Sequence, residues 1–116
     1  MKFSTEQSDN TVIFTLKNKS LNSDIAPELK AKLLIVCQPD IEALIIDLAN
    51  VETIDSSGIG ALLLAQRQMN EYGLPVILTA VNEQVMAILE ILHLEEFFDI
   101  YPSVEEAMQD LSESDS

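Results

Sequence analysis

The chain has 116 residues, a length that suits one domain, and 47% of them are hydrophobic, which is enough for a real core. Its formal net charge is −14, from 20 acidic and 6 basic residues. Such a surface repels phosphate backbones, so we do not expect nucleic-acid binding; it favours a partner with a basic patch, or only keeps the domain soluble.

The chain shows no sign of secretion or membrane insertion. Residues 1–10 are polar and lack the apolar centre of a signal peptide. No apolar run approaches the roughly 20 residues that a membrane-spanning helix needs. The single cysteine, Cys37, lies in the apolar sequence LLIVCQ and cannot form an internal disulfide. These features predict a cytoplasmic protein.

The first third of the chain predicts two strands and a helix. Residues 11–17 are rich in β-branched side chains, and residues 2–7 predict a short edge partner across a turn at 8–10. The helix that follows is expected to begin with a cap at Asn22 or Ser23. Its apolar residues recur at helical spacing, with Pro27 in the first turn: Ile25, Leu29, Leu33 and Val36.

The rest of the chain alternates between strands and helices. Residues 43–48, 75–80 and 97–101 are apolar runs that predict strands. Helices are expected from the DSSG sequence to about Tyr72, after a cap at Asn82, and after a cap at Ser103. Residues 112–116 (SESDS) predict an acidic disordered tail.

This order indicates the α/β class. Strands that alternate with helices imply right-handed crossovers and a largely parallel sheet. We therefore expect a single domain over residues 1–111, with a mostly parallel mixed sheet of about five strands and about four helices.

The sequence TIDSSGIGA, residues 53–61, is unusually polar for the start of an apolar helix. Asp55 or either of the next two serines would make a good helix N-cap. Capping does not explain Gly58 and Gly60, each of which costs roughly 1 kcal/mol against alanine in a helix. Glycines here indicate a close approach, either by a neighbouring strand or by another protein, and the residues alone leave both open.

The sequence IIDLANVETIDSSGIGALLLAQRQMNEYG resembles the signature of the STAS domain. This family comprises anti-sigma-factor antagonists and also the cytoplasmic tails of sulfate transporters. The similarity continues through PVILTAVNEQVMAILEILHLEEFFDIYPSVEEAM, so that it covers the last two-thirds of the chain well and the first third loosely.

The resemblance implies a phosphorylation switch at Ser56, the serine directly after the aspartate. In antagonists of this family that serine is phosphorylated by an anti-sigma factor that is itself a serine kinase. The unphosphorylated domain binds the anti-sigma factor and frees the sigma factor, and a PP2C-type phosphatase resets it. The matching positions that flank the serine imply a partner-binding surface of Asp55, Ser57, Gly58 and Gly60.

The segment between the second expected strand and the first expected helix departs from the family pattern. Many antagonists have a glycine and then an aspartate in the segment that reads LKNKSLNSDIA in this chain. Asn18 or Lys19 stands in place of the glycine, and Asn22 in place of the aspartate. The resemblance makes Asn22 a further partner-binding residue and implies that recognition of the kinase differs.

Other chemistry is poorly supported. A serine hydrolase needs a base beside the nucleophile, but the only histidine, His93, lies at the end of a different expected helix. Asp47 and Asp55 invite comparison with phosphate-accepting receiver domains, but the acidic pair and the lysine of those domains are missing, so Asp47 is expected to cap its strand or loop. We expect no enzyme activity, metal or cofactor.

The alternative to a phosphorylated regulator is an unphosphorylated STAS scaffold subunit in a lipid-transport ABC complex or a stress-signalling assembly.

Overall fold

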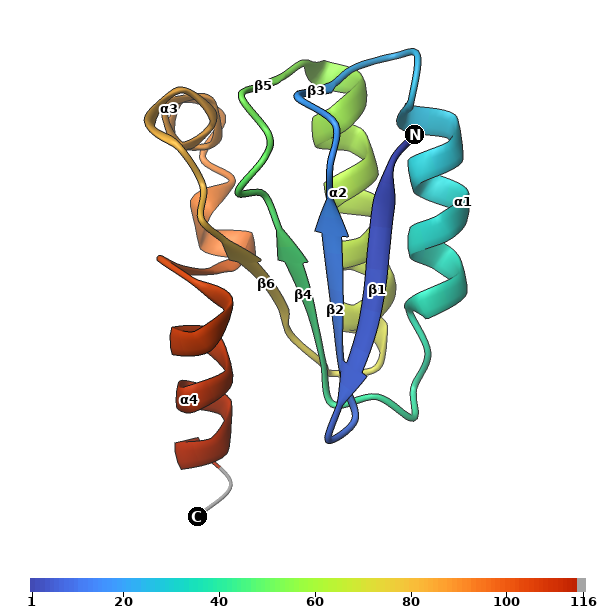
Figure 1. Ribbon diagram of the computed structural model, residues 1–116, viewed down its shortest axis with the longest axis vertical. Helices are drawn as coiled ribbons and strands as arrows, with labels where there is room; N and C mark the ends of the chain where they lie inside the picture. The colour runs from blue at the N-terminus through green and yellow to red at the C-terminus, as the bar shows by residue number, and fades with distance from the viewer. Residues whose placement is uncertain (115–116) are drawn as a thin grey trace.

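A five-stranded sheet forms the centre of the computed structural model, which describes residues 1–114 (Figure 1). The strands lie in the order β1-β2-β4-β6-β7. β1 is antiparallel to β2 and every other neighbouring pair is parallel, which confirms the predicted mixed sheet. Their bounds are β1 Phe3–Ser8, β2 Thr11–Leu16, β4 Ala43–Asp47, β6 Val76–Thr79 and β7 Asp99–Tyr101.

Four α-helices cover the two faces of this sheet, as the sequence predicts. Their bounds are α1 Ala26–Val36, α2 Ser56–Glu71, α3 Glu83–Ile91 and α4 Val104–Ser114, and a short 3-10 helix, η1, spans Glu95–Phe97. Alternate residues of a strand point to opposite faces. In β4, Leu44 and Ile46 therefore join the large core with α1, α2 and α3, whereas Ile45 joins a smaller core under α4.

The two strands of the β1–β2 hairpin differ in burial, because β1 is the edge strand of the sheet. Asp9 and Asn10 both have positive φ, 49° and 69°, which is the backbone geometry of a tight hairpin turn. On the covered face Phe3 stacks on Phe14, with the ring centroids 5.0 Å apart. The opposite face of β1 carries exposed polar residues, whereas Ile13, on the same side of β2, is buried in the smaller core.

A second, two-stranded sheet was not predicted. β3 (Ser20–Leu21) pairs in parallel with β5 (Thr53–Ile54) beside the N-terminus of α2 (Figure 1). Two residues are too few for an alternating pattern to be visible in a sequence. This small sheet holds the DSSG sequence in place.

The predicted cap of α1 is wrong. The N-cap residue is Ile25, which has no side-chain cap. The Asn22 carbonyl oxygen instead accepts hydrogen bonds from the backbone N–H groups of Ile25 and Ala26, at 3.2 and 3.0 Å. A backbone turn therefore satisfies the first donors of the helix, and Pro27 lies in the first turn as predicted.

The C-terminal end of the described chain differs from the prediction, and it lies far from the N-terminus. The disordered tail predicted from residue 112 is wrong for residues 112–114, because α4 continues to Ser114, with neither glycine nor proline there to end it; residues 115–116 lie outside the described residues. The Met1 ammonium group lies 3.5 Å from Glu28 in the first turn of α1. The N-terminus and the end of α4 thus lie at opposite ends of the molecule (Figure 1).

Candidate functional site

The DSSG sequence lies where the chain passes from β5 into α2, beyond the carboxyl end of the parallel strand β4 (Figure 1). Asp55, one of the three capping residues that the sequence allows, is the N-cap of α2. Its Oδ1 atom accepts hydrogen bonds from the backbone N–H groups of Ser57, at 2.9 Å, and Gly58, at 3.1 Å. One carboxylate oxygen therefore satisfies two of the donors that a helix leaves unpaired at its start.

Ser56 is the first residue of α2, and it is exposed. Ser57 is half-buried. Two neighbouring serines thus differ in access, and Ser56 is the one that another protein can reach more freely. It also lies where the positive end of the helix dipole favours negative charge.

Gly58 and Gly60 have different surroundings. A Cβ atom at Gly58 would lie 2.5 Å from the Leu21 carbonyl oxygen and 2.8 Å from Ile54 Cγ1. The close approach at Gly58 therefore comes from the small β3–β5 sheet of the same chain. A Cβ atom at Gly60 would meet nothing within 4 Å, so no part of the described chain requires a glycine there.

The loop before DSSG is held by β3 and the residue before it. The Lys19 carbonyl oxygen accepts hydrogen bonds from the N–H groups of Glu52, at 2.7 Å, and Thr53, at 3.2 Å. The Leu21 carbonyl oxygen accepts one from the Asp55 N–H group at 3.0 Å. These bonds fix the register in which α2 begins.

Asn22 follows Leu21 and so lies in the loop that leaves this small sheet. It is half-buried, and its Oδ1 atom accepts a hydrogen bond from the Asp24 N–H group at 3.0 Å. The structure therefore brings the Asn22 loop beside the DSSG sequence, with the amide oxygen engaged in its own turn. A role of Asn22 in partner binding stays a prediction.

Asn82 has a role that the sequence reveals only in part. It caps α3 as predicted, because its Oδ1 atom accepts a hydrogen bond from the Val85 N–H group at 2.8 Å. In addition, its Nδ2 group donates to the carbonyl oxygens of Val51, at 3.1 Å, and Glu52, at 3.0 Å. Asn82 thus ties α3 to the loop that leads into DSSG, and no pattern in the sequence points to this contact.

Asp47 has the capping role that we expected. Its Oδ1 atom accepts hydrogen bonds from the Ala49 N–H group and from the buried Thr79 hydroxyl group, both at 3.2 Å. These bonds join the ends of β4 and β6. A local structural role therefore accounts for this carboxylate.

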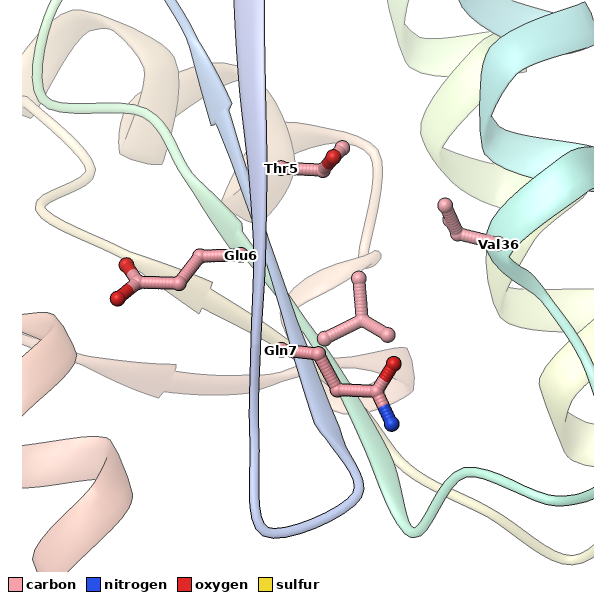
Figure 2. Close-up of a pocket in the computed structure, with 5 residues that line it drawn as sticks. Thr5, Glu6, Gln7 and Val36 are labelled. Carbon is pink, nitrogen blue, oxygen red and sulfur yellow. The ribbon is translucent and has the colours of Figure 1, made fainter.

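A small cavity lies away from the DSSG sequence. A cavity of about 130 Å³ lies between β1 and α1; Thr5 and Gln7 point toward Val36 on α1, whereas Glu6 points to the other side (Figure 2). None of the candidate site residues lines it.

Cys37 is buried, and burial raises the pKa of its thiol to about 11, so the sulfur stays protonated at neutral pH and behaves as a core atom.

No helix within residues 1–114 combines the length and apolar character that crossing a membrane requires.

Several solved structures share the fold of this chain. A STAS domain protein from Planctomyces limnophilus has 19% identity and a TM-score of 0.86, over 93% of this chain and 95% of that one. The Bacillus cell-fate determinant SpoIIAA in its phosphorylated form has 20% identity and a TM-score of 0.74, over 95% and 99%. A sulfate transporter family protein from Wolinella succinogenes has 20% identity and a TM-score of 0.74, over 84% and 81%.

A family model also matches this chain. The model of the STAS domain matches residues 2–107, which is most of the chain and includes both the first strands and the DSSG sequence. The resemblance that the sequence suggests over its last two-thirds therefore extends through the first third. This chain belongs to the STAS domain family.

Proposed function

We propose that the protein is a cytoplasmic anti-sigma-factor antagonist that phosphorylation of Ser56 switches off. In its unphosphorylated form it binds an anti-sigma factor that is a serine kinase, so that the sigma factor is released and transcription changes. The kinase phosphorylates Ser56, and a PP2C-type phosphatase reverses the modification. The protein acts in this partner-switching pathway by binding and not by catalysis.

The exposed position of Ser56 at the start of α2 is the observation that carries this proposal. A kinase needs an accessible hydroxyl group, and a partner that senses the phosphate must reach the same point. The solved structure of SpoIIAA in a phosphorylated form supports the proposal, because that protein has the same fold.

The physical effect of the phosphate is expected at the interface and not in the fold. A phosphate adds about −1.5 to −2 charges and three acceptor oxygens. The helix N-terminus favours this charge by roughly 0.3–1 kcal/mol, whereas the neighbouring Asp55 carboxylate opposes it. Because these effects are of similar size, the folded state changes little. A dianion pressed against a partner without a cation is costly, so binding is lost.

Phosphorylation with a candidate anti-sigma-factor kinase and Mg-ATP tests the proposal. Intact mass should show one phosphate on the wild-type chain and on Ser57→Ala, and none on Ser56→Ala. Ser57 is the matched control because it is the adjacent serine of the same motif. Modification of Ser57, or of neither serine by any serine kinase encoded beside the gene, would contradict the assignment.

Binding to the same kinase gives the second measurement. Ser56→Ala should bind like the wild-type chain and stay bound in the presence of ATP, whereas Ser56→Glu should bind at least about tenfold more weakly. Equal binding by both variants would mean that the charge at residue 56 is not what the partner senses.

A scaffold role is the second candidate, and the packing of Gly58 favours it. Asp55 and Gly58 are both accounted for by contacts within the chain. A DSSG sequence kept for these contacts would need no kinase, and the protein would serve as an unphosphorylated subunit of a lipid-transport ABC complex or a stress-signalling assembly. Full function of both Ser56→Ala and Ser56→Asp would support this role.

A further inference from the structure

The C-terminal end of α3 and η1 together expose three large apolar side chains. Ile91, the last residue of α3, is 74% exposed; Leu92, its C-cap, is 50% exposed; and Phe97, at the end of η1, is 52% exposed. α3 and η1 contact each other, and we call these three exposed residues together the α3–η1 patch. Exposed apolar side chains that cluster, unlike scattered single ones, mark interaction sites.

Acidic residues flank the members of this patch in the sequence. Glu90, Glu96 and Asp99 are exposed, and Glu95 begins η1 between the apolar residues. Glu95 Oε2 is shielded from solvent and has no hydrogen-bond partner within the described part of the chain. Because that oxygen is shielded by the chain itself, the carboxylates that a partner's cation can reach are the exposed ones of Glu90, Glu96 and Asp99.

The charge of the patch argues against a second copy of this chain as its occupant. Two such patches facing each other would bring two sets of acidic residues together, on molecules that each carry a formal charge of −14. From Leu33 onward, Arg67 is the only basic residue. The charge instead complements a partner that combines apolar and basic side chains.

The patch is distinct from the surface around Ser56. The N-terminal end of α3 is the end that binds the loop before DSSG, through Asn82. Ile91 lies nine residues further on, roughly 13 Å along the helix axis. Contact at the patch therefore does not require contact with Ser56.

We propose that the α3–η1 patch docks an amphipathic, basic segment of a partner protein. Ile91, Leu92 and Phe97 contact the apolar side of that segment, and lysine or arginine side chains on its edges pair with the exposed Glu90 and Glu96. The docked segment adds affinity that is independent of the phosphorylation state of Ser56.

A synthetic amphipathic helix of leucine and lysine, about 18 residues long, is a suitable probe. Titration into ¹⁵N-labelled protein should shift the amide signals of residues 88–99 most strongly. Two control peptides separate the contributions: one with glutamate in place of each lysine, and one with serine in place of each leucine. Each should bind at least about tenfold more weakly, because each removes one of the two matched properties.

Variants of the protein locate the site. Ile91→Ser with Phe97→Ser should weaken binding of the leucine–lysine peptide by about tenfold, and Glu96→Gln by a few-fold. Ile35→Ser is the matched control, because Ile35 is 66% exposed but lies on α1, and it should bind like the wild-type chain. Ser56→Glu should also leave peptide binding unchanged. All substituted apolar side chains are exposed, and thermal unfolding checks that the variants are folded.

Two results would overturn the proposal. Signal shifts spread over acidic residues throughout the surface, with equal loss in Ile35→Ser, would mean unspecific attraction to the net charge. A concentration-dependent dimer of the wild-type chain that the double variant abolishes, measured by sedimentation, would mean that a second copy covers the patch.

Discussion

Gly58 lies against Leu21 so closely that a Cβ atom at residue 58 would come within 2.5 Å of the Leu21 carbonyl oxygen and 2.8 Å of its Cβ atom. The obstacle is backbone and the base of a side chain, so it has little freedom to move. The helix that carries Ser56 is thereby seated directly on β3, a strand from a distant part of the chain.

Gly58→Ala is therefore expected to destabilise the protein, although alanine favours helices. Overpacking costs typically about 1–3 kcal/mol, which exceeds the roughly 1 kcal/mol that alanine gains over glycine in a helix. Gly60→Ala is the matched control: it meets nothing within 4 Å and should raise stability by up to about 1 kcal/mol. Urea unfolding of both variants measures the difference. Equal stabilisation by both substitutions would contradict the contact with Leu21.

Gly60→Ala also tests whether a partner approaches α2 closely. Because the chain itself leaves room at this position, loss of kinase binding without loss of stability would show that the partner needs the space. Unchanged binding would mean that the partner contacts a different part of the helix.

Asp55→Ala should lower the free energy of unfolding by about 0.5–2 kcal/mol. The substitution leaves the N–H groups of Ser57 and Gly58 without their acceptor. Asp55→Asn, which keeps a cap oxygen, should recover most of the loss. If Asp55→Asn were stable but failed to bind the kinase, the carboxylate charge would have a second role at the interface.

Substitutions of Asn82 should separate its two contributions. Asn82→Ser keeps an oxygen for the Val85 N–H group but removes the donors to Val51 and Glu52, whereas Asn82→Ala removes both. We expect Asn82→Ala to be less stable than Asn82→Ser by about 1 kcal/mol, the value of the cap. Hydrogen exchange of residues 49–55 should rise in both variants, because the loop before DSSG has lost its anchor.

His93→Gly is expected to stabilise the protein by about 1 kcal/mol. His93 has a φ of 57° in the turn that ends α3. In this left-handed conformation a Cβ atom is crowded by the backbone, whereas glycine adopts it without that cost. Ala87→Gly in the middle of α3 is the control and should destabilise by about 1 kcal/mol. The urea midpoints of the two variants should therefore move in opposite directions.

The buried thiol of Cys37 gives a pH-dependent prediction. Burial raises its pKa from 9.0 to about 11 in the folded protein, so the folded state holds the proton more tightly than the unfolded state does. The stability that this adds is complete below pH 9 and is lost as the pH rises to about 11. The difference in unfolding free energy between the wild-type chain and Cys37→Ala should fall over that range, and thiol reagents should label the native protein far more slowly than the denatured one.

The sequence predicts the main sheet and its helices because these elements are long enough to show their periods. α2 and a cap within its polar motif were predicted, but only the structure selects Asp55 over the two serines as that cap. The β3–β5 sheet did not, since each strand has two residues, and the α1 cap failed because the Asn22 carbonyl oxygen does what a side chain was expected to do. Whether Gly58 meets its own chain or a partner depended on Leu21, which only the folded structure brings beside it.

The position of the N-terminus has a practical consequence for every binding assay described above. The backbone of Lys2 bonds to Lys17 and Asn18, and the neighbouring Lys19 holds the loop before DSSG. An affinity tag or fluorophore attached at Met1 would therefore project beside the surface that the kinase is proposed to touch, and would compete with it. A label placed beyond α4, at the opposite end of the molecule, leaves that surface clear (Figure 1).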